Sequence, residues 1–519
     1  MPQWALRPTQ TPRGGLVVDR ILTVPEPVGD APAVDVAANE WVALPEIAAA
    51  GCLSVNVLHE GYRGLVEFRG APLIAGAGRY VVPPGFRGFA CDGPRWRGSF
   101  GAAGLALFSR RPLQAPERVY FQPFSQCLVW EVEGVAALAL RGRNLRVDGR
   151  AWEAEGPLFL GVAPEGDGAG CMAVDLARHG VAALAAAQAA EEARLRAASG
   201  LGEGELAELA FRNLLFCYRF AAGRALDTEQ WCLVTSRSPR YYVAAAHWSR
   251  DSLLWALPGI RAVDPERARL WVEVALRRYG RHPGEHALYL DGAVLYPGFE
   301  LDQAAALALA ARGAGLDGPS LAPYRDAATG LYRTFLLPSD DPAQMPFVTY
   351  DNVLVWAATG EPPELADAIR RHCVVDGPLG PQFAWAVDGR GGHVLYDEPP
   401  GSLELLSYHG FCRPEEPAYR NTVAWIHSPR NPDHIGGSPF GDVGCPHAPY
   451  PWVLSWANGL LAGRGLGQAV PAMDGGLACE SVDPVTGRVR TGPAFATAAG
   501  FLGHALRLRL LRAVQAPRR

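Results

Sequence analysis

The sequence lacks the local signatures by which many enzymes bind cofactors or activate nucleophiles. It contains no Walker loop, no nucleotide-type GxGxxG after a strand and no GxSxG. Its ten cysteines include no CxxC pair, and its histidines show no HxH or HExxH spacing. These absences leave cofactor chemistry and the serine-hydrolase route without support, and they predict that no metal is bound.

Targeting signals and strong charge are also absent. The opening residues MPQWALRPTQTPRGG have no apolar signal-peptide core, and no apolar run approaches the length of a membrane span. The net charge of -5 gives no indication of a nucleic-acid or membrane partner. The scattered cysteines are typical of free, mostly buried thiols, so the sequence predicts a cytoplasmic protein.

The periodicity predicts a multidomain α+β chain. Residues 1–172 hold short apolar runs separated by Gly- and Pro-rich turns, which is typical of an all-β domain, most simply a two-sheet sandwich. An Ala-rich segment at 173–203 is predicted to be a linker helix. Residues 204–519 have a helical period with long loops, which favours an (α/α)6 toroid as the catalytic domain. The expected helices are 204–222, 251–260, 264–279, 300–314, 320–336, 347–358, 361–373, 449–463 and 493–512, with a long loop at 375–448.

The most unusual stretch is 241–260, YYVAAAHWSRDSLLWALPGI. Arg250 and Asp251 stand beside Trp248 at the start of an apolar helix, where a buried ion pair is costly unless each charge finds partners. A sugar offers such partners, because its hydroxyl groups both donate and accept hydrogen bonds and its ring packs on an aromatic face. The alternative is a helix N-terminus in which Ser249 or Asp251 caps the helix and Arg250 pairs locally.

Acidic residues recur at the edges of the predicted helices. They are Glu300 and Asp302 in YPGFELDQ, Asp340 and Asp341 in PSDDP, and Glu480 in CESVDP. Each has a structural alternative, such as a helix-dipole contact, a plain turn, or for Glu480 an ion pair with Arg488 or Arg490. Together they indicate glycoside hydrolysis, which needs two carboxyl groups across the scissile bond.

Histidines crowd into one region, at 409, 427, 434 and 447, with Asp433, Asp442 and Cys445 nearby. A metal site could be drawn from them, but none has a short ligand spacing. The segment 428–452 is more simply a Gly/Pro-rich loop over the site, whose His447 and Trp452 are available to contact sugar.

The order WSRDS, YPGFELD, LPSDDP and a C-terminal ES before an Ala-rich helix resembles the metal-independent exo-α-mannosidases, which are inverting glycoside hydrolases built on an α/α barrel. The resemblance covers roughly residues 204–519. The WxRD piece is also similar to glycogen-debranching and processing α-glucosidases. The departures are Cys479, Leu337 and Gln303, where the family has His, Arg and Ser.

The resemblance implies that Asp340 or Asp341 is the general acid, with Asp340 preferred, and that Glu480 is the general base. An inverting reaction would place the two carboxyl groups roughly 6.5–9.5 Å apart. The substrate is expected to be an oligosaccharide or glycoside, either an α-mannoside or, alternatively, an α-glucan; a non-catalytic carbohydrate-binding protein is the other alternative. The residues expected to bind the sugar are Tyr242, His247, Trp248, Arg250, Asp251, Glu300, Asp302, His447 and Trp452.

Overall fold

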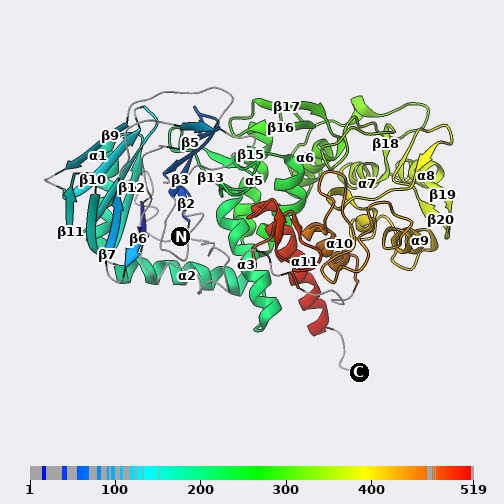
Figure 1. Ribbon diagram of the computed structural model, residues 1–519. Helices are drawn as coiled ribbons and strands as arrows, with labels where there is room; N and C mark the ends of the chain where they lie inside the picture. The colour runs from blue at the N-terminus through cyan, green and yellow to red at the C-terminus, as the bar shows by residue number, and fades with distance from the viewer. Residues whose placement is uncertain are drawn as a thin grey trace.

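The computed structural model describes residues 15–18, 38–43, 55–68, 79–82, 90–92, 95–99, 106–108, 117–122, 125–132, 134–149, 151–179, 181–464, 470–471, 473 and 475–515. Figure 1 shows two sheets on one side and a larger helix-rich part on the other. Among these residues, no helix is both long and apolar enough to cross a bilayer. The eight cysteines whose side chains are described are free thiols, and all but Cys171 are buried.

A seven-stranded sheet lies farthest from the helix-rich part. Its strand order is β6(Ala90–Asp92), β7(Arg95–Ser99), β12(Ala151–Ala163), β11(Ala136–Asp148), β10(Cys127–Val132) and β9(Glu117–Gln122), with β1(Gly15–Val18) also paired to β12. Side chains alternate between the two faces of a strand. Leu128 and Trp130 of β10 therefore join one core, whereas Cys127 and Val129 join another on the opposite face.

A five-stranded sheet lies between the seven-stranded sheet and the helices (Figure 1). Its order is β2(Val42–Ala43), β3(Val55–His59), β4(Gly64–Phe68), β5(Arg79–Val82) and β8(Ala106–Phe108). Its Phe68 packs edge-on against Trp130 of the other sheet, with ring centroids 5.2 Å apart. The two sheets thus share one core. A complete sandwich over 1–172 stays a prediction, because many connecting residues lie outside the described ones.

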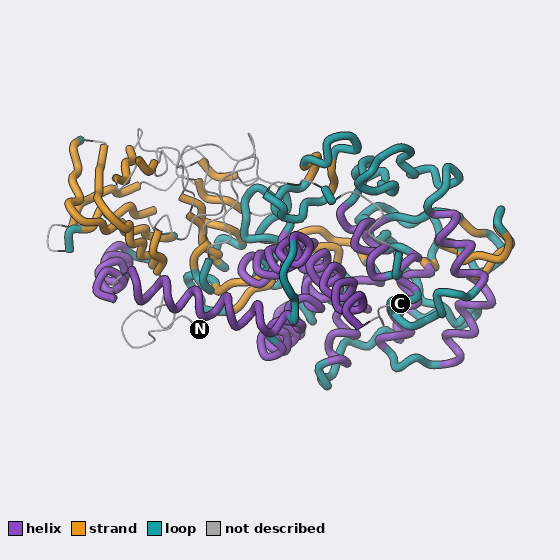
Figure 2. Tube along the Cα trace, turned by 90° about the horizontal axis from the view of Figure 1, so that it is seen from below, coloured by secondary structure: helices purple, strands orange, loops and turns teal. Residues whose placement is uncertain are grey.

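Two helices, rather than the one predicted for 173–203, connect the sheets to the rest. The first, α1(Gly166–His179), begins inside the region expected to be all-β because its Ala169, Met172 and Ala173 cover the outer face of the seven-stranded sheet. The second, α2(Val181–Ser199), runs from that sheet towards α3 (Figures 1 and 2). The predicted domain boundaries at 172 and 203 stay predictions.

The helix-rich part is built from α3(Glu205–Phe220), the π-helical turn η3(Arg250–Ala256), α4(Leu257–Val263), α5(Pro265–Arg278), α6(Leu301–Gly313), α7(Thr349–Ala358), α8(Pro363–Cys373), α9(Pro417–Ile426), α10(Val453–Leu461) and α11(Ala496–Gln515). All residues of α7 are buried, which is typical of a central helix.

Short hairpins and turns decorate the loops between these helices. The hairpins are β13(Ala222–Arg224) with β14(Trp231–Leu233); β15(Ala246–His247), β16(Glu285–Tyr289) and β17(Val294–Phe299); β18(Phe347–Val348), β21(Ala386–Val387) and β22(His393–Val394); β19(Val374–Gly377) with β20(Gly380–Phe383); and β23(Ser481–Val482) with β24(Val489–Thr491). The 3-10 turns are η4(Ala322–Tyr324), η5(Pro399–Gly401) and η6(Leu403–Leu406).

One predicted helix, 320–336, is wrong. Only η4 forms there, because Asp326 Oδ1 accepts hydrogen bonds from the backbone N–H groups of Ala328 and Thr329 at 3.1 and 2.9 Å and closes a tight turn. A helix was also missed: α9 lies inside the predicted loop 375–448 and begins at Pro417, a residue favoured at the first helical position.

The close contact of α1 with β12 gives a test. A Cβ atom at Gly161 would lie 2.0 Å from the carbonyl oxygen of Ala169, so Gly161→Ala should shift α1 and lower the free energy of unfolding by about 1–3 kcal/mol. Denaturant unfolding measures this. Gly202→Ala is the matched control, because a Cβ there meets nothing within 4 Å. Equal stability of the two variants would contradict the packing described.

Candidate active site

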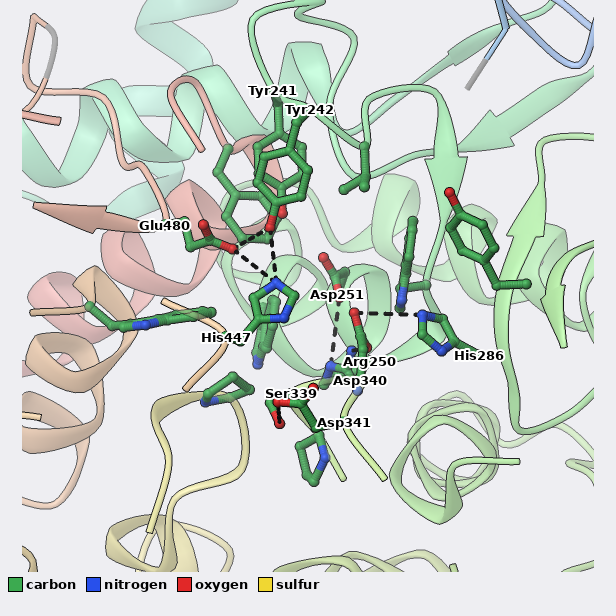
Figure 3. Close-up of a pocket in the computed structure, with 18 residues that line it drawn as sticks. Tyr241, Tyr242, Arg250, Asp251, His286, Ser339, Asp340, Asp341, His447 and Glu480 are labelled. Carbon is green, nitrogen blue, oxygen red and sulfur yellow. Dashed lines mark hydrogen bonds and ion pairs between the residues drawn. The ribbon is translucent and has the colours of Figure 1, made fainter. Parts of the chain in front are cut away.

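A cavity of about 370 Å³ opens among loops of the helix-rich part (Figure 3). Its walls come from segments far apart in the chain: the loop before β15, the turn η3, the β16–β17 hairpin, the turn at 338–341, the loop at 447–452 and the segment around Glu480. The lining residues are Tyr241, Tyr242, Val243, Trp248, Arg250, Asp251, Trp255, His286, Tyr296, Pro338, Ser339, Asp340, Asp341, Pro400, His447, Trp452, Glu480 and Phe495.

The guanidinium group of Arg250 holds one wall of the cavity together. It begins η3, is 2% exposed, and its Nη1 donates to Glu300 Oε2 at 2.9 Å and Asp302 Oδ2 at 3.0 Å. Its Nη2 donates to Asp340 Oδ1 at 2.6 Å, and its Nε lies 3.8 Å from Asp251 Oδ2. One guanidinium thus holds carboxylates from three separate segments. The buried pair that the sequence indicated is real, and its partners are protein acids.

Gln303 completes this arrangement. Its side-chain oxygen accepts the backbone N–H of Arg250 at 2.8 Å, and its Nε2 donates to Glu300 Oε2 at 3.0 Å. The start of η3 and the start of α6 are therefore fixed to each other. A serine, which the resemblance leads one to expect at 303, has a shorter side chain and only one polar atom for these two contacts.

Several buried carboxyl groups surround the single positive charge of Arg250. Burial raises the pKa of Asp251 to about 8 and also raises the pKa values of Glu300 and Asp302, while Arg250 opposes each shift. Burial acts against the charge of Arg250 itself, but Asp302, Asp340 and Glu300 outweigh it and hold the pKa of Arg250 well above its usual range. The guanidinium therefore stays charged while part of the acid cluster retains protons.

Three of the predicted sugar-binding residues do not line the cavity. Glu300 and Asp302 are fully buried behind Arg250, because they supply its counter-charge. His247 is also buried and stacks on Tyr279 with ring centroids 3.5 Å apart, and burial lowers its pKa to about 3. Their positions do not support direct contact with a sugar. The other six predicted residues line the cavity.

The turn at 338–341 presents two acids to the cavity. The backbone N–H of Asp340 donates to Leu337 O at 2.9 Å, and that of Leu337 donates to Asp341 O at 2.7 Å. Asp340 has a φ of 72°, a left-handed conformation that is uncommon outside glycine. Such backbone strain clusters at functional sites. The carboxyl group of Asp340 lies between Arg250 and His286, whose Nε2 is 3.7 Å from Asp340 Oδ2 (Figure 3).

Glu480 faces the same cavity from the opposite side (Figure 3). It is 3% exposed, accepts a hydrogen bond from the hydroxyl of Tyr242, and lies 3.9 Å from His447 Nε2. Burial raises the pKa of Glu480, and the Tyr242 hydroxyl opposes the shift. The alternative ion pair with Arg490 is not formed, because that guanidinium lies over the Tyr450 ring at 4.9 Å.

Sequence reasoning missed several residues at this site, and three of them are polar groups of interest. His286 and Tyr241 line the cavity, and Glu398 accepts the backbone N–H of Ser339 at 2.9 Å, supporting the acidic turn from behind. A lone histidine or tyrosine carries no spacing signal. Glu398 precedes Pro399 and Pro400 as Asp341 precedes Pro342, so acids before proline are a signal that could have found it.

One trio among the described residues could hold a metal ion. Ligand atoms of His286, Glu300 and Asp340 lie within 4.8 Å of one another. However, Arg250 already donates to both carboxylates, so a metal ion there would face a guanidinium charge. The histidine-rich region supplies no such cluster among the described residues. We assign no metal to either place.

The loop that carries His447 and Trp452 is held by a partly buried histidine. His427 Nδ1 lies 2.9 Å from both carboxylate oxygens of Asp442, and its Nε2 lies 3.4 Å from Glu404 Oε1, which also pairs with Arg464. Burial opposes the charge on His427, but these acids outweigh it and raise its pKa to about 9.

This arrangement predicts a pH-dependent stability. The pKa of His427 is raised above its unfolded value, so its contribution is complete below about pH 6.5 and is lost as the pH rises through about 9. Compared with His427→Gln, the wild type should be more stable by at most about 3 kcal/mol at pH 6, and the two should converge near pH 10. Thermal or urea unfolding across this range measures the difference. Parallel pH profiles would contradict a charged His427.

Comparison with known proteins supports the resemblance predicted from the sequence. Residues 359–464 match the family model of the metal-independent alpha-mannosidases (GH125). The matched segment includes His447, Trp452 and Glu398 but not the acids at 340, 341 and 480. No curated protein matches the chain.

The solved structures that are similar to the chain include two glycosidases. A bacterial glucoamylase complexed with acarbose has 12% sequence identity and a TM-score of 0.52, covering 96% of this chain and 88% of the glucoamylase. This likeness shows the fold. A Streptococcus pneumoniae metal-independent alpha-mannosidase, in a non-productive complex with alpha-1,6-mannobiose, has 16% identity and a TM-score of 0.48, covering 59% and 94% of the two chains. The family match over residues 359–464 supports a glycoside hydrolase similar to the metal-independent alpha-mannosidases, and the glucoamylase likeness adds the fold.

Proposed function

We propose that the chain is an exo-acting, inverting α-glycoside hydrolase that removes terminal mannose from oligosaccharides without a metal ion. The observation that carries this proposal is the position of Glu480 and the Asp340–Asp341 turn in the walls of one cavity. Two carboxyl groups that face a common space are the minimum that glycoside hydrolysis needs. Trp248 and Asp251 in the same wall are suited to an apolar sugar face and its hydroxyl groups.

Asp340 is the preferred general acid. Its carboxyl group lies between Arg250 and His286 at the cavity. Asp340 and Glu480 line the same cavity, although they come from segments far apart in the chain. Asp341 lines the same cavity and is the alternative acid. The acid protonates the leaving glycosidic oxygen as the bond to the anomeric carbon breaks.

Glu480 is the proposed general base. Tyr242 and His447 both contact its Oε1. These contacts would fix the ionised carboxylate and position a water molecule beside it. The carboxylate takes a proton from the water as the oxygen attacks the anomeric carbon on the face opposite the leaving group. The product sugar then has the inverted configuration.

An α-glucosidase acting on α-glucans is the second candidate. The fold likeness to glucoamylase over 96% of the chain favours it. A phosphorylase is not favoured, because Arg488 and Arg490 are exposed and do not line the cavity. Released mannose from α-mannosides, as opposed to glucose from isomaltose or limit dextrin, would decide between the first two.

Substitution of the two carboxyl groups tests the mechanism. Glu480→Gln should lower kcat by at least about 1000-fold on every substrate, since the attacking water loses its base. Asp340→Asn should lower kcat similarly on mannobiose but much less on a dinitrophenyl α-mannoside, whose leaving group needs no proton. Asp341→Asn is the matched variant for the assignment of the acid. Unchanged turnover in Glu480→Gln, or turnover abolished by a chelator, would contradict the proposal.

The Tyr242 hydroxyl predicts a shift in the pH profile. Its hydrogen bond lowers the pKa of Glu480 against the larger effect of burial, so Tyr242→Phe should raise that pKa further. A base must be ionised, so activity is lost as the pH falls through its pKa. The acidic limb of kcat/KM should therefore move to higher pH in Tyr242→Phe. A limb that stays in place would show that Glu480 does not set it.

A further inference from the structure

The five-stranded sheet faces two different cores. Along β3, Val55 and Val57 belong to the core shared with the seven-stranded sheet, whereas Leu58 belongs to the core of the helix-rich part. Asn56 lies on the same face as Leu58, is fully buried, and points away from the inter-sheet core. In the strands whose side chains are described, β3 and β4, Leu58 and Leu65 pack against the helix-rich part, and this side of the sheet therefore faces it.

Backbone hydrogen bonds join this sheet to the helix-rich part. The N–H of Leu226 donates to Leu58 O at 2.8 Å, and the N–H of Arg224 donates to Glu40 O at 2.7 Å. The carboxylate of Asp227 accepts the N–H groups at residues 60 and 61 at 2.9 and 2.8 Å. Such contacts fix relative position more tightly than apolar packing does, because hydrogen bonds are directional.

The next segment of chain, residues 234–246, carries the two tyrosines of the cavity, and we name it the tyrosine loop. The sheet holds the loop at Arg237, whose carbonyl oxygen accepts Asn56 Nδ2 at 2.5 Å. The guanidinium of Arg237 is also fully buried, and its Nη1 donates to Asn39 O at 2.8 Å and to Arg219 O at 3.1 Å. Burial lowers the pKa of Arg237 to about 9.

A buried cation held by carbonyl oxygens is an expensive way to stabilise a loop. Nε and Nη2 of Arg237 are buried without a hydrogen-bond partner. An apolar side chain at 237 would fill the space at lower cost. The arrangement instead fixes the direction of the chain at this point, since the main chain and side chain of Arg237 are held by separate segments.

On its other side the tyrosine loop holds the segment of Glu480. Ser236 Oγ donates to Ala494 O at 2.8 Å and accepts the N–H of Ser238 at 3.0 Å. Tyr241 stacks on Phe495 with ring centroids 4.1 Å apart, and the hydroxyl of Tyr242 donates to Glu480 (Figure 3). The loop thus contacts the N-terminal sheet at one edge and the proposed base at the other.

We propose that the five-stranded N-terminal sheet positions the general base. Asn56 and Arg237 fix the position of the tyrosine loop, and the loop fixes the position of the Glu480 carboxyl group through Tyr242. Asn56 and Arg237 are positioning residues, because neither lines the cavity. The inference rests on the proposed hydrolase function. It gives the N-terminal sheet a part in catalysis in a fold whose chemistry lies among helices.

The test is a double-mutant cycle in the full chain. Asn56→Ala should lower kcat about tenfold or more with a smaller change in KM, and it should move the acidic limb of kcat/KM to higher pH, as Tyr242→Phe does. Because both changes act on the same contact, the double variant should be no slower than Tyr242→Phe alone. Independent, multiplicative losses, or an unmoved acidic limb, would overturn the proposal.

Two further variants keep the test decisive. Val57→Ala removes a neighbouring buried side chain on the opposite face of β3, so it should lower Tm but leave kcat and the pH profile unchanged. Arg237→Met removes the loop's bond to Asn39 O on the N-terminal side and should reproduce the non-additivity with Tyr242→Phe even where Asn56→Ala does not fold. If Val57→Ala changed kcat and the pH profile as Asn56→Ala does, the effect of Asn56→Ala would be a general loss of stability. That outcome would contradict the inference. Failure of the hydrolase function would show separately, as a wild-type chain inactive on α-glycosides or indifferent to Glu480→Gln.

Discussion

The contact between Arg250 and its carboxylates is the interaction on which the cavity depends. Removing a guanidinium and several carboxylates from water costs several kcal/mol per ion, and only mutual contact at hydrogen-bonding distance offsets this. Glu300 and Asp302 come from the start of α6, and Asp340 comes from a loop turn. Because all of them must meet one planar group, the three segments have a fixed relative geometry before any substrate binds.

Helix positions could be predicted from the sequence where a segment has one buried face. The predicted segments 264–279 and 361–373 correspond to α5 and α8 within about two residues at each end, because each helix buries only one face and its apolar period is clear. The same signal failed at 320–336, where one aspartate side chain competes for the backbone, and at α9, which lies within the predicted loop 375–448. Helix α1 was missed because its small residues pack against a sheet. Hydrophobic periodicity along the chain does not reveal such a packing partner.

The acids of the site could be predicted as a set but not as individuals. Sequence order indicated that Glu300, Asp340 and Glu480 belong together, yet it could not separate an acid that lines the cavity from one that neutralises Arg250. That distinction depends on which side of a guanidinium each carboxylate occupies, which spacing along the chain does not encode. His286 and Tyr241 were missed for the same reason, since single residues acquire meaning only from neighbours brought in by the fold.

The left-handed backbone at Asp340 restricts how this position can change through evolution. Asparagine and glycine tolerate such a conformation readily, whereas branched or bulky side chains do not. A descendant that abandoned hydrolysis but retained its architecture would therefore be expected to replace the carboxylate with an amide or a hydrogen atom, preserving the bend. Loss of function would therefore be seen as substitution by asparagine or glycine at this one position. A loop that had also lost its conformation would instead accept many different residues there.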